Sequence, residues 1–130
     1  MEIVQYIILR KDLQMTYNKG VAQGSHSVMK IFFDRSELCG EKDNYHLKIP
    51  ITNEMKEWWE GIFTKIVLVV NSEEELVELY EKAKEMGFPC CMIEDVGRTE
   101  FGGKKTKTAI AIGPDVREKI SQITSHLKTR

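Results

Sequence analysis

The hydrophobic residues of this chain change their spacing several times, and each change predicts a new element. Residues 3–10 and 65–70 are short, nearly continuous apolar runs, as in strands covered on both faces. Residues 19–33 instead repeat apolar side chains every three or four positions, which predicts an amphipathic helix. The predicted stripe of that helix comprises Val21, Ala22, Ser25, Val28, Met29, Phe32 and Phe33.

The later part of the chain alternates in the same way. Residues 34–57 are polar and predict a long loop followed by a short helix over about 52–58. A further helix begins at Ser72, whose hydroxyl can cap the first turn while Glu75 reaches back to it. Two more strands are predicted over 90–93 and 108–112, and Gly113-Pro114-Asp115 is expected to open a last helix.

This order of elements predicts the fold class. Strands alternating with helices form a largely parallel sheet that is covered on both faces. The connection between the last two strands has no helical pattern. Those two strands are therefore antiparallel, or an irregular loop connects them. We therefore expect one α/β domain over residues 1–130, with a four-stranded mixed sheet between two layers of helices and residues 34–55 as an extended insertion.

Composition places the chain among ordinary globular proteins, since 42% of its residues are hydrophobic and 30% are charged. No apolar run approaches the roughly 20 residues of a membrane span, and the N-terminal residues do not resemble a signal peptide. We expect a cytoplasmic protein without a membrane partner. The three cysteines lack metal-ligand spacing, and Cys90 and Cys91 point to opposite faces of a strand, so we expect free thiols, no metal and no cofactor.

Charge is balanced overall but unevenly distributed. Nineteen basic residues stand against twenty acidic ones, for a net charge of −1. A nucleic-acid-binding protein is more often basic overall. The acidic residues, however, gather on the helix after Ser72, and the basic ones gather in three connecting segments: Arg10, Lys11, Lys19, Arg98, Lys104, Lys105 and Lys107.

Ligands of open α/β sheets bind beyond the carboxyl ends of the strands. That rule selects residues 10–20 and 94–103, both rich in charge and glycine. At about 100° per residue, Lys19, Gln23 and His26 share one narrow arc of the first helix, whose N-terminus attracts anions such as phosphate. The same three residues also fit the ordinary polar face of an amphipathic helix, and pattern alone favours that simpler interpretation.

A second candidate follows the strand at 90–93. Asp95 comes directly after apolar residues, where partial desolvation tunes the pKa of a carboxylate. Gly97 permits tight backbone geometry, and Arg98 and Thr99 add a bidentate donor and a hydroxyl. An ordinary turn with an Asp–Arg ion pair explains the pattern equally well. The motifs of serine hydrolases, P-loop NTPases and zinc proteases are absent from the sequence.

At these residues the sequence resembles the second type of peptidyl-tRNA hydrolase. Several spaced motifs in the right order carry the resemblance, which covers nearly the whole chain apart from residues 34–55. They are Arg10-Lys11-Asp12-Leu13 with Met15, Lys19, Ala22-Gln23 and Ser25-His26; Glu94 to Thr99; Thr108 to Pro114; and Thr124, His126, Leu127 and Lys128.

The resemblance implies a compact α/β fold around a four-stranded mixed sheet, often as a homodimer. It implies hydrolysis of the ester between an N-blocked peptide and the 3′ ribose of tRNA, which recycles peptidyl-tRNA. The site residues that it implies are Lys19, Gln23, His26, Asp95, Arg98 and Thr99, which are those placed at one end of the sheet by the topology rule.

No serine or cysteine nucleophile is evident, so attack by water is the simplest mechanism. We expect Asp95 to activate the water and Lys19 to stabilise the oxyanion or the terminal phosphate. Thr99 and His26 would assist, and which of Asp95 and His26 acts as the base stays open. Arg98 would position Asp95 or contact phosphate. The tRNA backbone would be held by Lys11, Lys104, Lys105 and Lys107.

Three other functions remain open at this stage. The chain is alternatively a catalytically inactive tRNA- or RNA-binding relative, a dimeric interaction module that uses residues 34–55, or a hydrolase of another aminoacyl ester. It also departs from the family at three places: Gly24 stands where cysteine is usual, residues 34–55 are longer, and Gly102-Gly103-Lys104-Lys105 replaces a loop with more proline.

Overall fold

β1 (Ile3–Arg10) and β6 (Thr106–Val116) form the centre of a four-stranded sheet in the computed structural model, which describes residues 1–96 and 101–129. The strand order is β4-β1-β6-β5, with β4 at Lys65–Val70 and β5 at Cys90–Asp95. β1 is parallel to β4, whereas β6 is antiparallel to both β1 and β5. The carboxyl ends of β1, β4 and β5 therefore lie at the same edge, and the predicted mixed sheet is confirmed.

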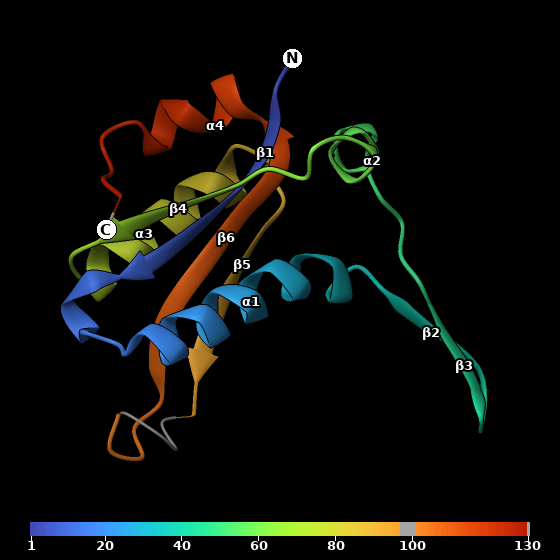
Figure 1. Cartoon of the computed structure of the whole chain (residues 1–130), viewed down its shortest axis with the longest axis horizontal. Helices are drawn as coiled ribbons and strands as arrows, with labels where there is room; N and C mark the ends of the chain where they lie inside the picture. Colours follow the sequence, from blue (N-terminus) through green and yellow to red (C-terminus); the bar gives the residue numbers. More distant parts are fainter. Residues whose placement is uncertain (97–100, 130) are drawn as a thin grey trace.

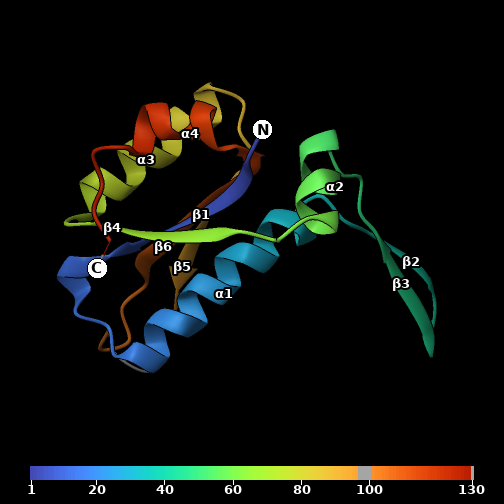
Figure 2. The same ribbon diagram turned by 45° about the horizontal axis from the view of Figure 1, so that its top comes forward.

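Helices cover both faces of this sheet (Figures 1 and 2). α1 (Tyr17–Phe33) and α2 (Asn53–Glu60) pack on one face, and α3 (Glu73–Glu85) and α4 (Arg117–Thr124) pack on the other. Val4, Tyr6 and Ile8, which alternate along β1, point to the face covered by α3 and α4. The single α/β domain with three layers that the sequence predicts is thus the fold observed. The larger apolar core includes Val4, Tyr6, Ile8, Leu76, Leu79, Ile110 and Ile120, and the one beneath α1 and α2 includes Ile31, Met55, Cys91 and Ala111.

Hydroxyl side chains cap the first three α-helices. The Ser72 Oγ accepts the Glu75 N–H at 3.1 Å, as the sequence predicts for α3. Thr16 and Thr52 accept the corresponding N–H groups of α1 and α2, at 3.2 and 3.0 Å. Each cap satisfies an N–H that the helix itself leaves without a partner, and so fixes where the helix begins.

The segment predicted as a long loop contains a β-hairpin instead. β2 (Glu37–Glu41) pairs with β3 (Asn44–Lys48), and the hairpin projects away from the sheet (Figure 1). Leu38 lies opposite Leu47, with Tyr45 on the same face, and all three side chains are exposed. Neither face of the hairpin is buried against the body. β3 alternates polar and apolar residues over only five positions and β2 does not alternate, so the sequence pattern is too short to predict the pair of strands.

The end of the sheet also differs from its prediction. β6 does not stop at Ile112 but continues to Val116, and α4 begins at Arg117 rather than at Gly113-Pro114-Asp115. Gly113 has a φ of 98°, and a Cβ at this position would lie 2.6 Å from the carbonyl oxygen of Val4. The glycine therefore allows the backbones of β6 and β1 to lie close together and does not mark the start of a helix.

The buried arc of α1 is not the apolar stripe that the sequence predicts. Val21 and Met29 are 53% and 50% exposed, and the side facing the sheet is formed mostly by small residues. A Cβ on Gly24 would already touch Ile7 Cγ2, at 3.4 Å, so α1 lies close to β1 at this position and only a small residue fits. The predicted stripe is thereby turned to the flank of the helix. The buried residues of α1 are Gly20, Gln23, Gly24, Ser27 and Ile31.

All three cysteines carry free thiols, of which Cys91 is buried and Cys39 and Cys90 are half-buried. Cys91 packs beneath α1 and α2, and Cys90 packs on the opposite face of β5. Burial raises the pKa of the Cys91 thiol from 9.0 to about 12. Within residues 1–96 and 101–129, no helix has the length and apolar character needed to cross a membrane.

Candidate active site

An ion pair joins the start of α1 to the end of β5. The Lys19 Nζ lies 3.1 Å from the Asp95 Oδ1, and the two side chains are only 12% and 14% exposed. The fold positions both groups, because Thr16 fixes the first turn of α1 and Asp95 is the last residue of its strand. Partial exclusion of water strengthens the attraction between such charges relative to a surface pair.

Gln23 supplies a second donor to the same carboxylate oxygen. It lies one turn after Lys19, and its Nε2 is 3.3 Å from Asp95 Oδ1. Its side chain is 1% exposed, so the amide is inside the protein rather than on a solvated helix face. Lys19 and Gln23 therefore converge on Asp95, and the simpler interpretation as a solvated polar surface does not hold for these two residues.

Thr108 fixes the orientation of that amide. Its hydroxyl donates to the Oε1 of Gln23, and its side chain is fully buried. With the amide oxygen engaged by a hydroxyl, the amide nitrogen is the group that faces Asp95. The result is a continuous polar chain from β6 through α1 to the end of β5.

A β-bulge explains why Thr108 reaches this position. The pairing of β5 with β6 shifts register, so that Ile93 pairs with Ala109 but the next residue, Glu94, pairs with Lys107. Thr108 is the extra residue, and the shift allows its side chain to reach the α1 face although simple alternation would place it on the other. Bulges commonly redirect a side chain next to a functional site in this way.

Sequence analysis did not select Thr108 as a site residue, nor Phe101, whose ring lies beside Lys19. One signal was available for Thr108, since it is a polar residue at the start of a run of buried apolar positions. A buried hydroxyl in such a run has a hydrogen-bond partner as a rule. The identity of the partner does not follow from the sequence, because it depends on the bulge.

The other predicted site residues are placed less tightly. His26 is exposed one turn after Gln23, and its side chain makes no hydrogen bond or ion pair with the described residues. Arg98 and Thr99 lie outside the described residues. Lys11, Lys104 and Lys105 are exposed, and Lys107 is half-buried.

Arg10 ties the ends of three elements together at this edge. Its guanidinium donates to Asp12, with the closest contact at 2.7 Å, and to the carbonyl oxygen of Lys107 at 3.0 Å. Glu73, at the start of α3, lies 3.7 Å away. Arg10 is thus held by carboxylates and a carbonyl, so that its charge is largely compensated, whereas the neighbouring Lys11 is exposed.

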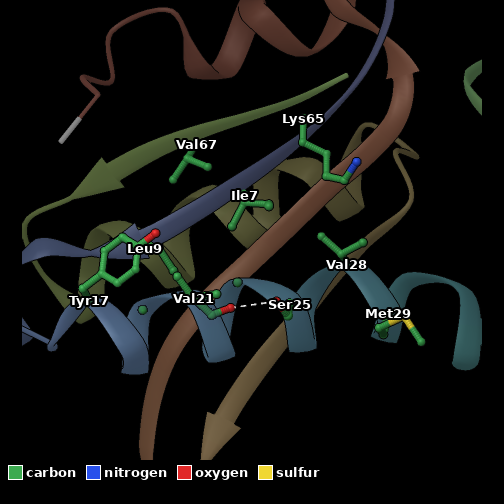
Figure 3. A pocket seen from close by; sticks show the side chains of 11 residues that line it. Ile7, Leu9, Tyr17, Val21, Ser25, Val28, Met29, Lys65 and Val67 are labelled. Carbon is green, nitrogen blue, oxygen red and sulfur yellow. Dashed lines mark hydrogen bonds between the residues drawn. The ribbon is translucent and has the colours of Figure 1, made fainter. Parts of the chain in front are cut away.

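An apolar groove of about 550 Å³ runs along the other flank of α1 (Figure 3). It lies between α1 and the β1 and β4 strands, whereas the polar chain joins α1 to β5 and β6. Tyr17, Val21, Met29 and Val67 line it and are exposed, and Lys65 is its only charged lining residue among those described. The groove is distinct from the Asp95 site and is the surface to which the predicted helix stripe was turned.

The described residues contain no group of three or more His, Cys, Asp or Glu side chains that could hold a metal ion. The site is instead a carboxylate that receives an ammonium and an amide donor at the carboxyl edge of a mixed sheet. The protein therefore belongs to the class of α/β proteins that carry a cluster of polar side chains at the carboxyl edge of the sheet, where such sheets bind ligands.

Comparison with known proteins identifies the family. The family model of peptidyl-tRNA hydrolase PTH2 matches residues 3–130. A peptidyl-tRNA hydrolase of Methanocaldococcus jannaschii is 40% identical over 122 residues, covering 94% of this chain and 95% of the relative. One from Staphylothermus marinus is 35% identical over 127 residues, covering 98% and 94%, and one from Methanococcus maripaludis strain C6 is 34% identical over 124 residues, covering 95% and 96%.

The chain belongs to the peptidyl-tRNA hydrolase PTH2 family. It is accordingly a hydrolase, and the resemblance found in its motifs is confirmed.

Proposed function

We propose that this protein hydrolyses the ester bond between an N-blocked peptide or amino acid and the 3′ ribose of tRNA, and so recycles peptidyl-tRNA. The observation that carries the proposal is the convergence of Lys19 and Gln23 on the Asp95 carboxylate at the carboxyl edge of the sheet. The family supports the same reaction, since its members are named for it.

In the proposed mechanism Asp95 orients a water molecule and accepts its proton as the water attacks the ester carbonyl. Gln23 holds the carboxylate in a single orientation, so that its proton-accepting oxygen is presented consistently. Lys19 lies within 3.1 Å of that carboxylate and is therefore close enough to the reacting carbon to stabilise the oxyanion as it forms. The proton then leaves with the ribose hydroxyl, which is the leaving group.

Three further residues are assigned more distant roles. His26 lies on the same helix as Lys19 and Gln23 and is exposed, which suits contact with the ribose end or transfer of a proton at the edge of the site. Thr99 is proposed to bond the water or the ribose, and Arg98 to position Asp95 or contact phosphate. The last two assignments rest on the resemblance alone.

The tRNA is proposed to bind through its phosphates, with little reading of sequence. Lys11, Lys104, Lys105 and Lys107 are the candidates, since all four lie in or beside the connecting segments at the site edge. The compensated charge of Arg10 makes it a poorer candidate for phosphate binding than its neighbour Lys11.

We also propose a homodimer that acts in the cytoplasm. The exposed apolar side chains along the flank of α1 support the dimer, because contiguous apolar surface of this kind commonly marks an interface. Light scattering of the purified protein tests it. A Val21→Glu variant of a dimer held by this surface would be monomeric, and a wild-type monomer at micromolar concentration would refute the proposal.

The reaction is tested by release of an N-blocked amino acid from tRNA in the presence of EDTA, with Asp95→Asn beside the wild type. Asp95→Asn keeps the shape of the side chain but cannot accept the proton, so turnover should collapse. A variant that retained the full rate would refute the assignment of Asp95 as base.

The same assay separates the alternatives. Intact tRNA binding without turnover would indicate a catalytically inactive RNA-binding relative. Absence of both would indicate an interaction module. Equal hydrolysis of blocked and free aminoacyl-tRNA would indicate a broader esterase of aminoacyl-tRNA.

A further inference from the structure

The Lys19 ammonium has an aromatic neighbour as well as an acidic one. Its Nζ lies 5.5 Å from the centre of the Phe101 ring, while it pairs with Asp95 at 3.1 Å. An ammonium within about 6 Å of a ring centre is attracted by the negative face of the π system. Lys19 comes from α1, Asp95 from the end of β5, and Phe101 from the connection that leads to β6.

Phe101 is not explained as part of the hydrophobic core. It is half-buried, yet it belongs to none of the three apolar clusters formed by the described residues. A large apolar side chain in a surface connection usually packs on such a cluster or is exposed. The aromatic contact recorded for this ring is with the charged group of Lys19.

A tight turn holds Phe101 in place. The Lys104 N–H donates to the Phe101 carbonyl oxygen at 3.1 Å, which closes a four-residue turn. The two central residues, Gly102 and Gly103, have φ values of 60° and 77°, a conformation that glycine adopts without strain. The paired glycines are one of the departures of this sequence from its family, and here they shape the turn that carries the ring.

We propose that Phe101 is a positioning residue for hydrolysis, whose ring holds the Lys19 ammonium where it can meet the developing oxyanion. The inference rests on the proposed function of the site. A lysine side chain has several rotatable carbon–carbon bonds and loses considerable entropy when it is ordered. The ring restricts it without adding a second anion, which would compete with the oxyanion for the same charge.

The test compares Phe101→Leu with Phe101→Tyr in steady-state release of N-blocked amino acid from tRNA. Leucine keeps the apolar bulk but lacks the π face, whereas tyrosine keeps both. We expect Phe101→Leu to lower kcat by roughly three- to ten-fold, the size of a partly desolvated cation–π contact, with KM and melting temperature unchanged. Phe101→Tyr should have a kcat near the wild-type value. In a Lys19→Met background, Phe101→Leu should have no further effect on the rate.

A measurement without substrate distinguishes this inference from the reaction itself. A ring above the ammonium shifts the NMR resonances of the Lys19 ε-methylene group, and the shift should vanish in Phe101→Leu and persist in Phe101→Tyr. Unchanged resonances in Phe101→Leu, or an unchanged kcat, would overturn the positioning role while leaving the proposed function intact. A raised KM at constant kcat would also overturn it, since the ring would then stack on a base of the tRNA. Absence of wild-type turnover, with the ring-current shift present, would overturn the proposed function instead.

Discussion

Replacing Thr108 with valine tests the polar chain behind the site most directly. Valine has nearly the shape of threonine, so the change leaves no cavity but removes the hydroxyl that donates to the Gln23 Oε1. Gln23 is only 1% exposed, so water cannot readily replace the lost hydroxyl. A buried acceptor left without a partner costs about 1–3 kcal/mol.

The expected stability loss is large enough to measure. For a domain of this length, 1 kcal/mol corresponds to a fall of about 3–5 °C in melting temperature, so Thr108→Val should melt roughly 3–15 °C below the wild type. Activity should fall as well, because an amide that is no longer anchored can rotate and stop donating to Asp95. A hydrogen bond to a charged group contributes about 1.5–3 kcal/mol, so we expect a loss of at least about ten-fold in kcat/KM.

Thr106→Val is the matched control on the same strand. Thr106 is half-buried, and its hydroxyl donates to the Lys104 carbonyl oxygen at 2.9 Å, away from the Gln23 amide. Its substitution should change stability by no more than about 0.5 kcal/mol. Thr108→Ser, which keeps the hydroxyl, should retain most of the activity. If Thr108→Val melted and reacted like Thr106→Val, the orientation of Gln23 would not depend on Thr108, and the reasoning about the polar chain would be refuted.

Three further predictions concern other parts of the chain. Changing Lys104 and Lys105 together to alanine should weaken tRNA binding and reduce its log–log salt slope by about 1.5, and an unchanged slope in filter binding would exclude them as phosphate contacts. Burial raises the pKa of Cys91 from 9.0 to about 12, so at pH 8 only about one in ten thousand of these thiols is ionised. DTNB should therefore label Cys39 and spare Cys91 in the folded protein. The free energy of unfolding should decline as pH rises above 9, because the thiol loses its proton at a lower pH in the unfolded chain than in the folded one. Replacing residues 37–48 with a short Gly/Ser turn should leave turnover within about two-fold, because β2 and β3 pack chiefly on each other; a large loss of turnover would show that the hairpin takes part in the reaction.

The sequence predicts the main elements of this fold because their signals are local. The strands at 3–10 and 65–70 have the bounds expected, since each is a continuous apolar run. The start of α3 is equally local, because the Ser72 cap needs only the residue three positions later. The hairpin of 37–48 was not predicted, since it is exposed on both faces and only its second strand alternates polar and apolar residues, over five positions.

Non-local packing accounts for the other differences. The apolar stripe of α1 was expected to face the sheet, but the neighbouring arc, which contains the small residues Gly20, Gly24 and Ser27, is the buried one. Helical periodicity shows that two arcs differ in polarity, yet it does not show which arc another element will cover. Gly113 illustrates the same limit, since glycine is needed there because the backbone of Val4, on another strand, lies too close for a side chain.

The candidate site shows where prediction from residue types ends. A topology rule is sufficient to bring Lys19 and Asp95 to one edge of the sheet, because it depends only on strand order and direction. The partners that orient them depend on finer geometry. Thr108 reaches Gln23 because one extra residue in β6 shifts its register against β5, and Phe101 reaches Lys19 because two glycines close a turn. Residue types in a sequence therefore indicate the candidate site groups, whereas a bulge and a turn determine which residues contact them.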